Sequence, residues 1–450
     1  MTSRRVAMAL AMLVGVPIAA CALLVATALF ALRAAPGDWA VRVGLGPLGM
    51  ELSVPALIRV ATHPLGIRAL AGRSIVTRHG TVHVEQGATA TSLVVRCAPC
   101  IVDSRRLSAQ PLRLAEVDVT VEHGIANLMH GEIRAGAVHA AWRARLDASG
   151  TEIEIDLADT PVAALVALFG AAVPEAARAH IEGRAGGKLH LALPSQRYSV
   201  EPRLEGLAVD SLGSDVLLAA SPAPACARTP RAASATAPFG VWLPRAVVAA
   251  EDQRFYEHAG YDLAEMVAAW SDAGPAASSA TARRPDLADD HRRGASTLSQ
   301  QLAKLLYTGD EPSAARKVRE LLYAAELDRT LGKARVLQLY LAIVPWGDGQ
   351  CGGEAAALHY FGRHAASLGP AEAVWLASLL RNPQRELDRA ARVAGDADPT
   401  RLAAIAEALR PMPRWRRDDL AAQLVDWTAP PVVQMRAPPR RGYDRAGSLP

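Results

Sequence analysis

Glu251 ends the apolar run 247–250, so a helix over 242–258 would place its carboxylate at the end of a buried face. Burial raises the pKa of a carboxylate toward neutral pH, where the group can act as a general base or acid. Phe255 would lie one turn further along and wall such a site. The alternative is a structural ion pair between Glu251 and Arg254 or another cation, and Glu251 alone does not decide between the two.

The segment 294–304 (GASTLSQQLAK) brings hydroxyl, amide and ammonium groups to the predicted start of a helix. Its residues 297–300 fit a capping box, in which two side chains satisfy free N–H groups of the first turn. One face of that helix would carry four polar side chains, Thr297, Gln300, Gln301 and Lys304. Such a helix N-terminus suits a phosphate or pyrophosphate, and a solvated polar face is the alternative.

The segment 316–320 (RKVRE) places three cations and an acid within little more than one helical turn, and two of the cations, Arg316 and Lys317, stand four and three residues before Glu320. On a surface, pairs of Arg316 or Lys317 with Glu320 would contribute little, and the acid lies on the less favourable C-terminal side. Lysine usage adds weight, because the chain has 49 Lys+Arg but few lysines, namely Lys188, Lys304, Lys317 and Lys333. Three of these fall in or beside the motifs, which favours a cleft that binds an anion.

These motifs resemble, in order, those of the peptidoglycan glycosyltransferase domain of bacterial cell-wall synthases. That family includes monofunctional transglycosylases and the N-terminal half of bifunctional penicillin-binding proteins. The resemblance extends over 239–387, with E-D-x-x-F-x-x-H-x-G at 251–260, G-x-S-T-x-x-Q-Q-L-x-K at 294–304, R-K-x-x-E at 316–320, and further markers at 333–341, 352–362 and 372–383. The chain is identified on these motifs as a divergent member of the family.

The resemblance implies a mainly α, lysozyme-like fold for this domain and a role for each motif residue. Glu251 resembles the general base that deprotonates the sugar 4-hydroxyl of a lipid-linked acceptor, and Glu320 resembles the second acid, which orients cations or assists a metal-bound pyrophosphate. The other motif positions would bind substrate: Asp252, Phe255, His258, Ser296, Thr297, Gln300, Gln301, Lys304, Arg316, Lys317 and Asn382. Three of them, Lys304, Arg316 and Lys317, would neutralise the departing undecaprenyl pyrophosphate.

The implied partners are lipid II, the growing glycan chain, the membrane and other cell-wall synthesis proteins. The family requires no cofactor, although Mg²⁺ or another divalent cation can sit at the pyrophosphate, and no metal site made by the protein is expected. No Ser begins an S-x-x-K sequence, so transpeptidase activity is not expected.

Several positions depart from the family pattern. Leu305 replaces a usual Asn, Pro312 a usual Arg, Gln338 a usual Glu, Ala342 a usual Asn and Cys351 a usual Tyr. Pro312 removes one expected contact to the pyrophosphate. A degenerate domain that binds lipid-linked precursor, or that organises envelope assembly, therefore stays open beside the active enzyme.

Two different periodicities divide the chain. Helical patterns predominate after the linker, at 242–258, 297–307, 314–331, 334–344, 354–363 and 370–381. Alternating polar and apolar residues at 81–85, 116–121 and 152–157 indicate half-buried strands, interrupted by a helical pattern at 161–181. The predicted parts are a cytoplasmic tip and transmembrane anchor (1–36), a β-rich (α+β) membrane-proximal domain (37–220), a linker (221–238), the glycosyltransferase domain (239–390) and an Arg/Pro-rich tail (391–450). The predicted fold class is thus a mainly α domain preceded by a transmembrane helix and a β-rich domain.

The uncharged stretch 6–32 is long enough to span a bilayer. Arg4 and Arg5 precede it, so the positive-inside rule predicts a single-pass protein of the bacterial inner membrane with a periplasmic catalytic domain. The sequence 18–21 also resembles a lipoprotein cleavage site, but 22–32 stays apolar where a lipoprotein would turn polar.

Composition excludes some classes of function. A net charge of +4 gives little electrostatic support for nucleic-acid binding. Cys97 and Cys100 would form a local disulfide in an exported domain, with idle thiols as the alternative, and no ligands at zinc-site spacing accompany them.

Overall fold

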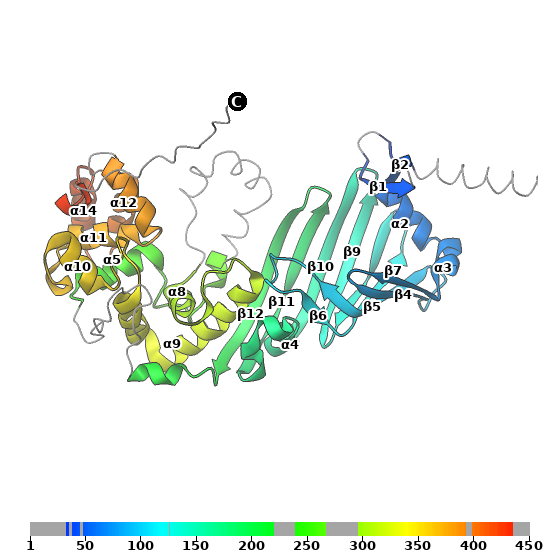
Figure 1. Ribbon diagram of the computed structural model, residues 1–450, viewed down its shortest axis with the longest axis horizontal. Coiled ribbons are helices and arrows are strands. Elements are labelled where there is room, and N and C mark those ends of the chain that lie inside the picture. Colours follow the sequence, from blue (N-terminus) through cyan, green and yellow to red (C-terminus); the bar gives the residue numbers. More distant parts are fainter. Residues whose placement is uncertain are drawn as a thin grey trace, which may run out of the picture.

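The computed structural model describes residues 33–35, 38–45, 48–125, 127–219, 239–266, 296–392 and 398–434. Figure 1 shows a long twisted sheet on one side and a group of helices on the other, which meet where helix α9 (Ala314–Ile343) lies next to the sheet.

The sheet region contains ten antiparallel strands in the order β12-β11-β10-β9-β8-β7-β5-β4-β3, with β6 paired to β5. Their bounds are β3 (Arg73–Thr77), β4 (Gly80–Gln86), β5 (Ser92–Val102), β6 (Leu112–Leu114), β7 (Val117–His123), β8 (Leu128–Ala135), β9 (Val138–Asp147), β10 (Gly150–Pro161), β11 (His180–Leu193) and β12 (Arg197–Asp210). A separate hairpin pairs β1 (Ala40–Leu45) with β2 (Leu48–Ser53). The strands predicted at 81–85, 116–121 and 152–157 fall on β4, β7 and β10.

Alternation of side chains explains why these segments form strands. Buried and exposed side chains alternate along the second half of β9, where Trp142 and Leu146 are buried. Arg145 lies on the opposite, exposed face and pairs with Glu152 of β10 at 2.7 Å. Helices α2 (Val54–Thr62) and α3 (Pro64–Leu70) pack on the same region, with Ile58 against the cluster around Trp142. The sheet therefore has its own small cores far from the helical region.

Short helices connect or follow the strands: α4 (Val162–Ala167), η1 (Gly170–Ala172), η2 (Pro174–Ala177) and η3 (Ser214–Leu218). The helical region consists of α5 (Trp242–Glu251), α8 (Leu298–Ala303), a π-helical turn η4 (Lys304–Thr308), α9, α10 (Gly353–Phe361), η5 (Ala365–Ser367), α11 (Pro370–Leu379), α12 (Pro383–Arg392), α13 (Pro399–Ala408), α14 (Arg414–Gln423) and α15 (Pro431–Gln434). Helix α5 ends at Glu251 and not at 258 as predicted. The predicted helices 314–331 and 334–344 form α9, which bends at Gly332 with φ of 72°.

One hydrophobic core crosses the junction between the two regions. Val166 of α4, Val209 of β12 and Leu322 of α9 all belong to it. The first N–H groups of α9, at Ala314 and Ala315, donate to backbone carbonyls of the loop 106–107 at 2.8 and 2.8 Å. The sheet region thus holds the start of the helix that carries the R-K-x-x-E motif.

The predicted fold class is wrong. A ten-stranded antiparallel sheet is a principal part of the described chain, so the protein is not mainly α. The prediction also included a transmembrane helix, but no helix within the described ranges is long and apolar enough to cross a membrane. The predicted span 6–32 and the whole linker 221–238 lie outside those ranges. The prediction of a mainly α fold rests on motifs at 239–387, which cover a minority of the chain and carry no information on the sheet.

Cys97 and Cys100 form a disulfide within β5, which confirms the first of the two alternatives for this pair. In the described part of the chain, no group of three or more His, Cys, Asp and Glu side chains is placed to hold a metal ion.

Candidate active site

The Glu251 carboxylate is held by donors from two other helices. Gln301 of α8 donates from Nε2 to its Oε2 at 3.2 Å, and Arg401 of α13 donates from Nη2 to its Oε1 at 3.1 Å. Burial raises the pKa of Glu251, whereas Arg401, the Gln301 hydrogen bond and Arg381 act to lower it. The proton affinity of this carboxylate is therefore set by burial against nearby positive charge.

A tyrosine fixes the orientation of the amide beside Glu251. Tyr340 donates from its hydroxyl to Gln301 Oε1 at 2.8 Å, so the amide group turns its NH₂ toward Glu251. Burial and the Glu251 carboxylate raise the pKa of Tyr340 well above its ordinary value, so it remains a donor. The two oxygens of Glu251 thus have distinct partners, one cationic and one neutral.

A second cluster gathers around Glu320, whose side chain is 2% exposed. Lys317 Nζ lies 2.9 Å from Glu320 Oε2 and donates to Ser296 Oγ at 2.6 Å. Arg316 Nη1 pairs with Glu320 Oε1. The buried acid therefore pairs with both cations.

Three cations, Lys304, Arg316 and Lys317, meet in this cluster beside the acids Glu320, Asp310 and Glu311. Burial, together with Arg316 and Lys304, lowers the pKa of Lys317 to about 8. Lys304, in η4, pairs with Asp310 at 2.6 Å and holds the pKa of that carboxyl below its usual value. Because Asp310 is 91% exposed, this pair can open to an incoming anion at little cost.

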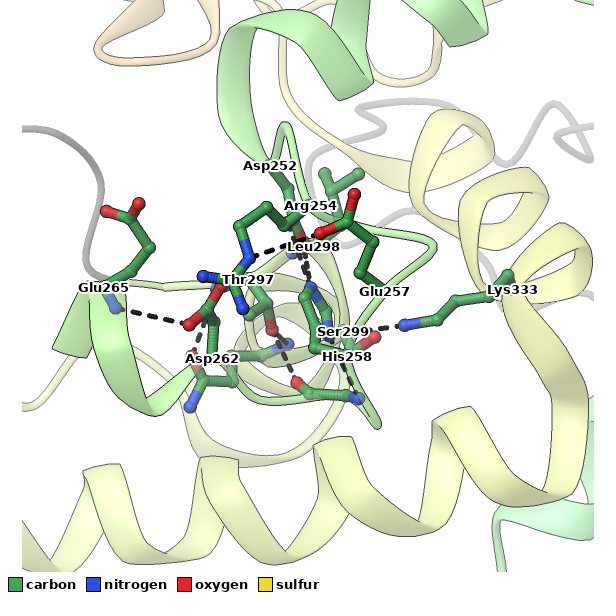
Figure 2. A network of polar contacts seen from close by, with 12 residues as sticks. Asp252, Arg254, Glu257, His258, Asp262, Glu265, Thr297, Leu298, Ser299 and Lys333 are labelled. Carbon is green, nitrogen blue, oxygen red and sulfur yellow. Dashed lines mark hydrogen bonds and ion pairs between the residues drawn. The ribbon is translucent and has the colours of Figure 1, made fainter. Parts of the chain in front are cut away.

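Asp252 and His258, which belong to the first motif (251–260), lie inside an internal polar network (Figure 2). Asp252 Oδ2 accepts from Leu298 N at 2.9 Å, and its Oδ1 lies 3.0 Å from His258 Nε2. His258 Nδ1 accepts from Gly260 N at 3.2 Å, so Nε2 carries the hydrogen that reaches Asp252. The anion at the N-terminus of α8 is thus the protein's own carboxylate.

Phe255 is fully buried and packs edge-on against His258, with ring centroids 6.2 Å apart. Lys333 Nζ lies 4.6 Å from the centre of the Phe255 ring and 2.9 Å from Asp328 Oδ1. Lys333 is therefore a structural cation at the side of this loop (Figure 2).

The capping box predicted at 297–300 is confirmed. Thr297 Oγ1 accepts from Gln300 N at 3.2 Å, and Gln300 Oε1 accepts from Thr297 N at 3.1 Å. Thr297 also donates to Gly260 O at 2.6 Å, and both side chains are buried. Of the polar face predicted for this helix, Gln301 reaches Glu251 and Lys304 joins the cations, whereas Thr297 and Gln300 hold the helix start.

Asn382 is exposed and accepts from Arg385 N at 3.3 Å, which caps the start of α12. The sequence did not identify Arg401, which contacts Glu251 from a segment predicted to be a tail. A signal for its helix was present, because Asp398-Pro399 is a helix start followed by buried Leu402 and Ile405.

Comparisons with known proteins agree on this part of the chain. Residues 228–401 match the family model described as Transglycosylase. A "Biosynthetic peptidoglycan transglycosylase" of Nitrosomonas eutropha is 42% identical over 142 residues, which are 32% of this chain and 53% of that protein. Proteins of the same name from Nitrosomonas europaea and Azoarcus sp. are 46% and 39% identical over 142 and 166 residues, covering 32% and 36% of this chain and 53% and 64% of their own lengths. The chain thus spans about half the length of the first two of these curated relatives.

Proposed function

Since residues 228–401 match the Transglycosylase family model, we propose that this protein polymerises lipid II into glycan strands and releases undecaprenyl pyrophosphate. The observation that carries the proposal is the presence of two features around α8: a buried carboxylate, Glu251, which accepts from Gln301 of that helix, and a set of cations, of which Lys317 donates to Ser296 just before the helix and Lys304 follows its end. Such a glycosyl transfer needs a base at the attacking hydroxyl and positive charge at the leaving group.

Glu251 is proposed as the base. Its Oε2 takes the proton of the acceptor 4-hydroxyl while that oxygen bonds to the anomeric carbon of the donor. The bond between the anomeric carbon and the pyrophosphate oxygen breaks, and its electron pair leaves on the pyrophosphate. The raised pKa of Glu251 supports this role, because a stronger base accepts a proton more readily near neutral pH.

Lys304, Arg316 and Lys317 are proposed to bind the departing pyrophosphate. Glu320 positions two of these cations, which fits the orienting role proposed for the second acid. In this arrangement the charge that develops on the leaving group meets ammonium and guanidinium groups already in place. A divalent cation at the pyrophosphate would be held by the phosphates, since the nearby carboxylates of Glu320 and Asp310 are already paired with Arg316, Lys317 and Lys304.

The proposed partners follow from the substrate. Lipid II and the growing glycan chain would bind between Glu251 and the cations, at the periplasmic surface of a bacterial inner membrane where the sugars are exposed. Other cell-wall synthesis proteins are proposed as partners of the same process. We propose no transpeptidase activity for these 450 residues, because they contain no S-x-x-K sequence.

The test is incubation of the purified full-length protein with labelled lipid II in detergent, followed by separation of glycan polymer from precursor. The expected result is polymer of increasing length together with free undecaprenyl pyrophosphate. Absence of polymer, under conditions in which a known transglycosylase produces it, would refute the proposal.

A second candidate is a domain that binds lipid-linked precursor without polymerising it. It is favoured by Arg401, which occupies one oxygen of Glu251, and by Pro312, which stands at an exposed position where the family has a cation. The same assay separates the two candidates, because a binding domain retains labelled lipid II and forms no polymer.

A further inference from the structure

Arg401 is built into the site from a helix that follows the motifs. It lies in the first turn of α13, where Asp398 caps the helix by accepting from the N–H groups of Thr400 and Arg401. Its guanidinium spans two partners: Nη2 donates to Glu251 Oε1 at 3.1 Å, and Nε donates to Ser378 O at 3.1 Å. The side chain is 19% exposed, so this contact is largely shielded from water.

The groups that face Glu251 come from several elements. They are Gln301 from α8, Tyr340 from α9, Arg381 after α11, and Arg401 from α13. Gln301 and Tyr340 are neutral, and Arg381 acts on the carboxylate through its charge. Arg401 combines charge with direct contact, and it lowers the pKa of Glu251 more than Arg381 does.

We propose that Arg401 is a positioning residue that keeps the buried Glu251 carboxylate ionised and occupies its Oε1, so that the acceptor hydroxyl meets Oε2, whose partner in the structure is the neutral Gln301 amide. This inference rests on the proposed role of Glu251 as the base. Without a cation in contact, a buried carboxylate holds its proton and cannot take another. A guanidinium group suits the position, because its separate N–H groups reach both the Glu251 carboxylate and the Ser378 carbonyl. The single ammonium group of a lysine cannot reproduce that geometry.

Loss of the Arg401 charge should change the pKa of Glu251 in one direction, upward. Burial already raises the pKa of Glu251 and Arg401 opposes that rise, so Arg401→Gln raises the pKa further. The fraction of ionised base then falls at neutral pH and recovers at higher pH. A residue with only a structural role would instead lower activity by the same factor at every pH.

The experiment compares kcat/KM for lipid II polymerisation across pH in the wild type, Arg401→Gln and Arg401→Lys. The acid limb of the profile is expected to move up by about one to three pH units in Arg401→Gln and by less in Arg401→Lys. Arg389→Gln is the matched control, since Arg389 pairs with Glu386 at 2.9 Å and with the α13 cap Asp398 at 3.3 Å. That control should leave the limb in place. An unmoved limb in Arg401→Gln, or higher activity than wild type at neutral pH, overturns the inference.

A direct titration separates this inference from the proposed function. The protonated carboxyl band of Glu251 is measured by infrared difference between each protein and its Glu251→Gln counterpart over the same pH range. Its midpoint should rise in Arg401→Gln whether or not polymer forms, and an unchanged midpoint contradicts the inference. If the midpoint rises while the wild type makes no polymer, the assignment of the reaction fails and the ionising role of Arg401 stands. Should Arg401→Gln fail to fold, Arg401→Lys gives the same test with a smaller expected shift.

Discussion

Burial acts in opposite directions on two groups of the candidate site. It raises the pKa of Glu251 and lowers that of Lys317 to about 8, because in both cases it disfavours the charged form. Titratable groups whose neutral form is favoured in this way are frequent at functional sites, where protons are transferred or charged ligands bind. For Lys317 the consequence can be measured directly.

The affinity for inorganic pyrophosphate should fall as pH rises through about 8, because Lys317 loses its proton there. The decline should approach about tenfold per pH unit once the neutral form predominates. Calorimetric titration of the full-length protein at several pH values measures it. In Lys317→Arg the charge persists, so the decline should be largely absent. The assignment is wrong if the wild type binds equally well below and above pH 8, or if both proteins show the same decline.

The loop 252–260 and the start of α8 form one structural unit. Asp252 receives hydrogen bonds from Leu298 N and His258, so the first motif stabilises the helix that carries Gln301. This arrangement explains the residue types of the motif without any contact to substrate.

Asp252→Asn should lower the free energy of unfolding by about 1–3 kcal/mol, because a buried pair of donors loses its anionic acceptor. Urea denaturation measures this change. Glu257→Gln is the control, since Glu257 is an exposed acid of the same loop. The affinity of the folded Asp252→Asn protein for the lipid-linked glycosyl donor should match that of the wild type. A weaker donor affinity with unchanged stability would instead assign Asp252 to substrate binding.

Sequence patterns predicted local features of these elements well. The capping box at 297–300 and the break in α9 at Gly332 depend on neighbouring residues, and both are present. The hydrogen bond from Leu298 to Asp252 spans 46 positions, and that from Arg401 to Glu251 spans 150. Such contacts depend on packing between distant segments, so periodicity could predict neither the internal role of Asp252 nor the arrival of Arg401.

At the scale of the whole molecule, α9 joins the candidate site to the sheet region (Figure 1). One side of the helix carries Arg316 and Lys317, whereas Arg319 donates from Nε to both oxygens of Glu175 at 2.9 and 2.9 Å. Tyr323 accepts from Arg178 at 2.7 Å, one turn further along. The strand patterns predicted strands, but they contained no information on this junction, because its partners are isolated side chains on short connecting helices.

Glu175→Gln should destabilise the protein by about 1–3 kcal/mol, because the largely buried Arg319 loses its charged partner. Asp210→Asn provides a matched control: its ion pair with Arg329 is exposed and should contribute less than about 1 kcal/mol. Thermal and urea unfolding measure both. Equal effects of the two substitutions would contradict a specific role of the Glu175 pair at the junction.

The central claim is that Glu251 is the base of a glycan polymerase, and Glu251→Gln tests it most directly. Glutamine keeps the size of the side chain and can still accept a hydrogen bond from Arg401, but it cannot take a proton. The measurement is the initial rate of lipid II polymerisation by full-length wild type and variant, with unfolding curves recorded for both. We expect a folded variant whose rate is lower by at least about 100-fold. A folded variant that polymerises lipid II at close to the wild-type rate would contradict the account.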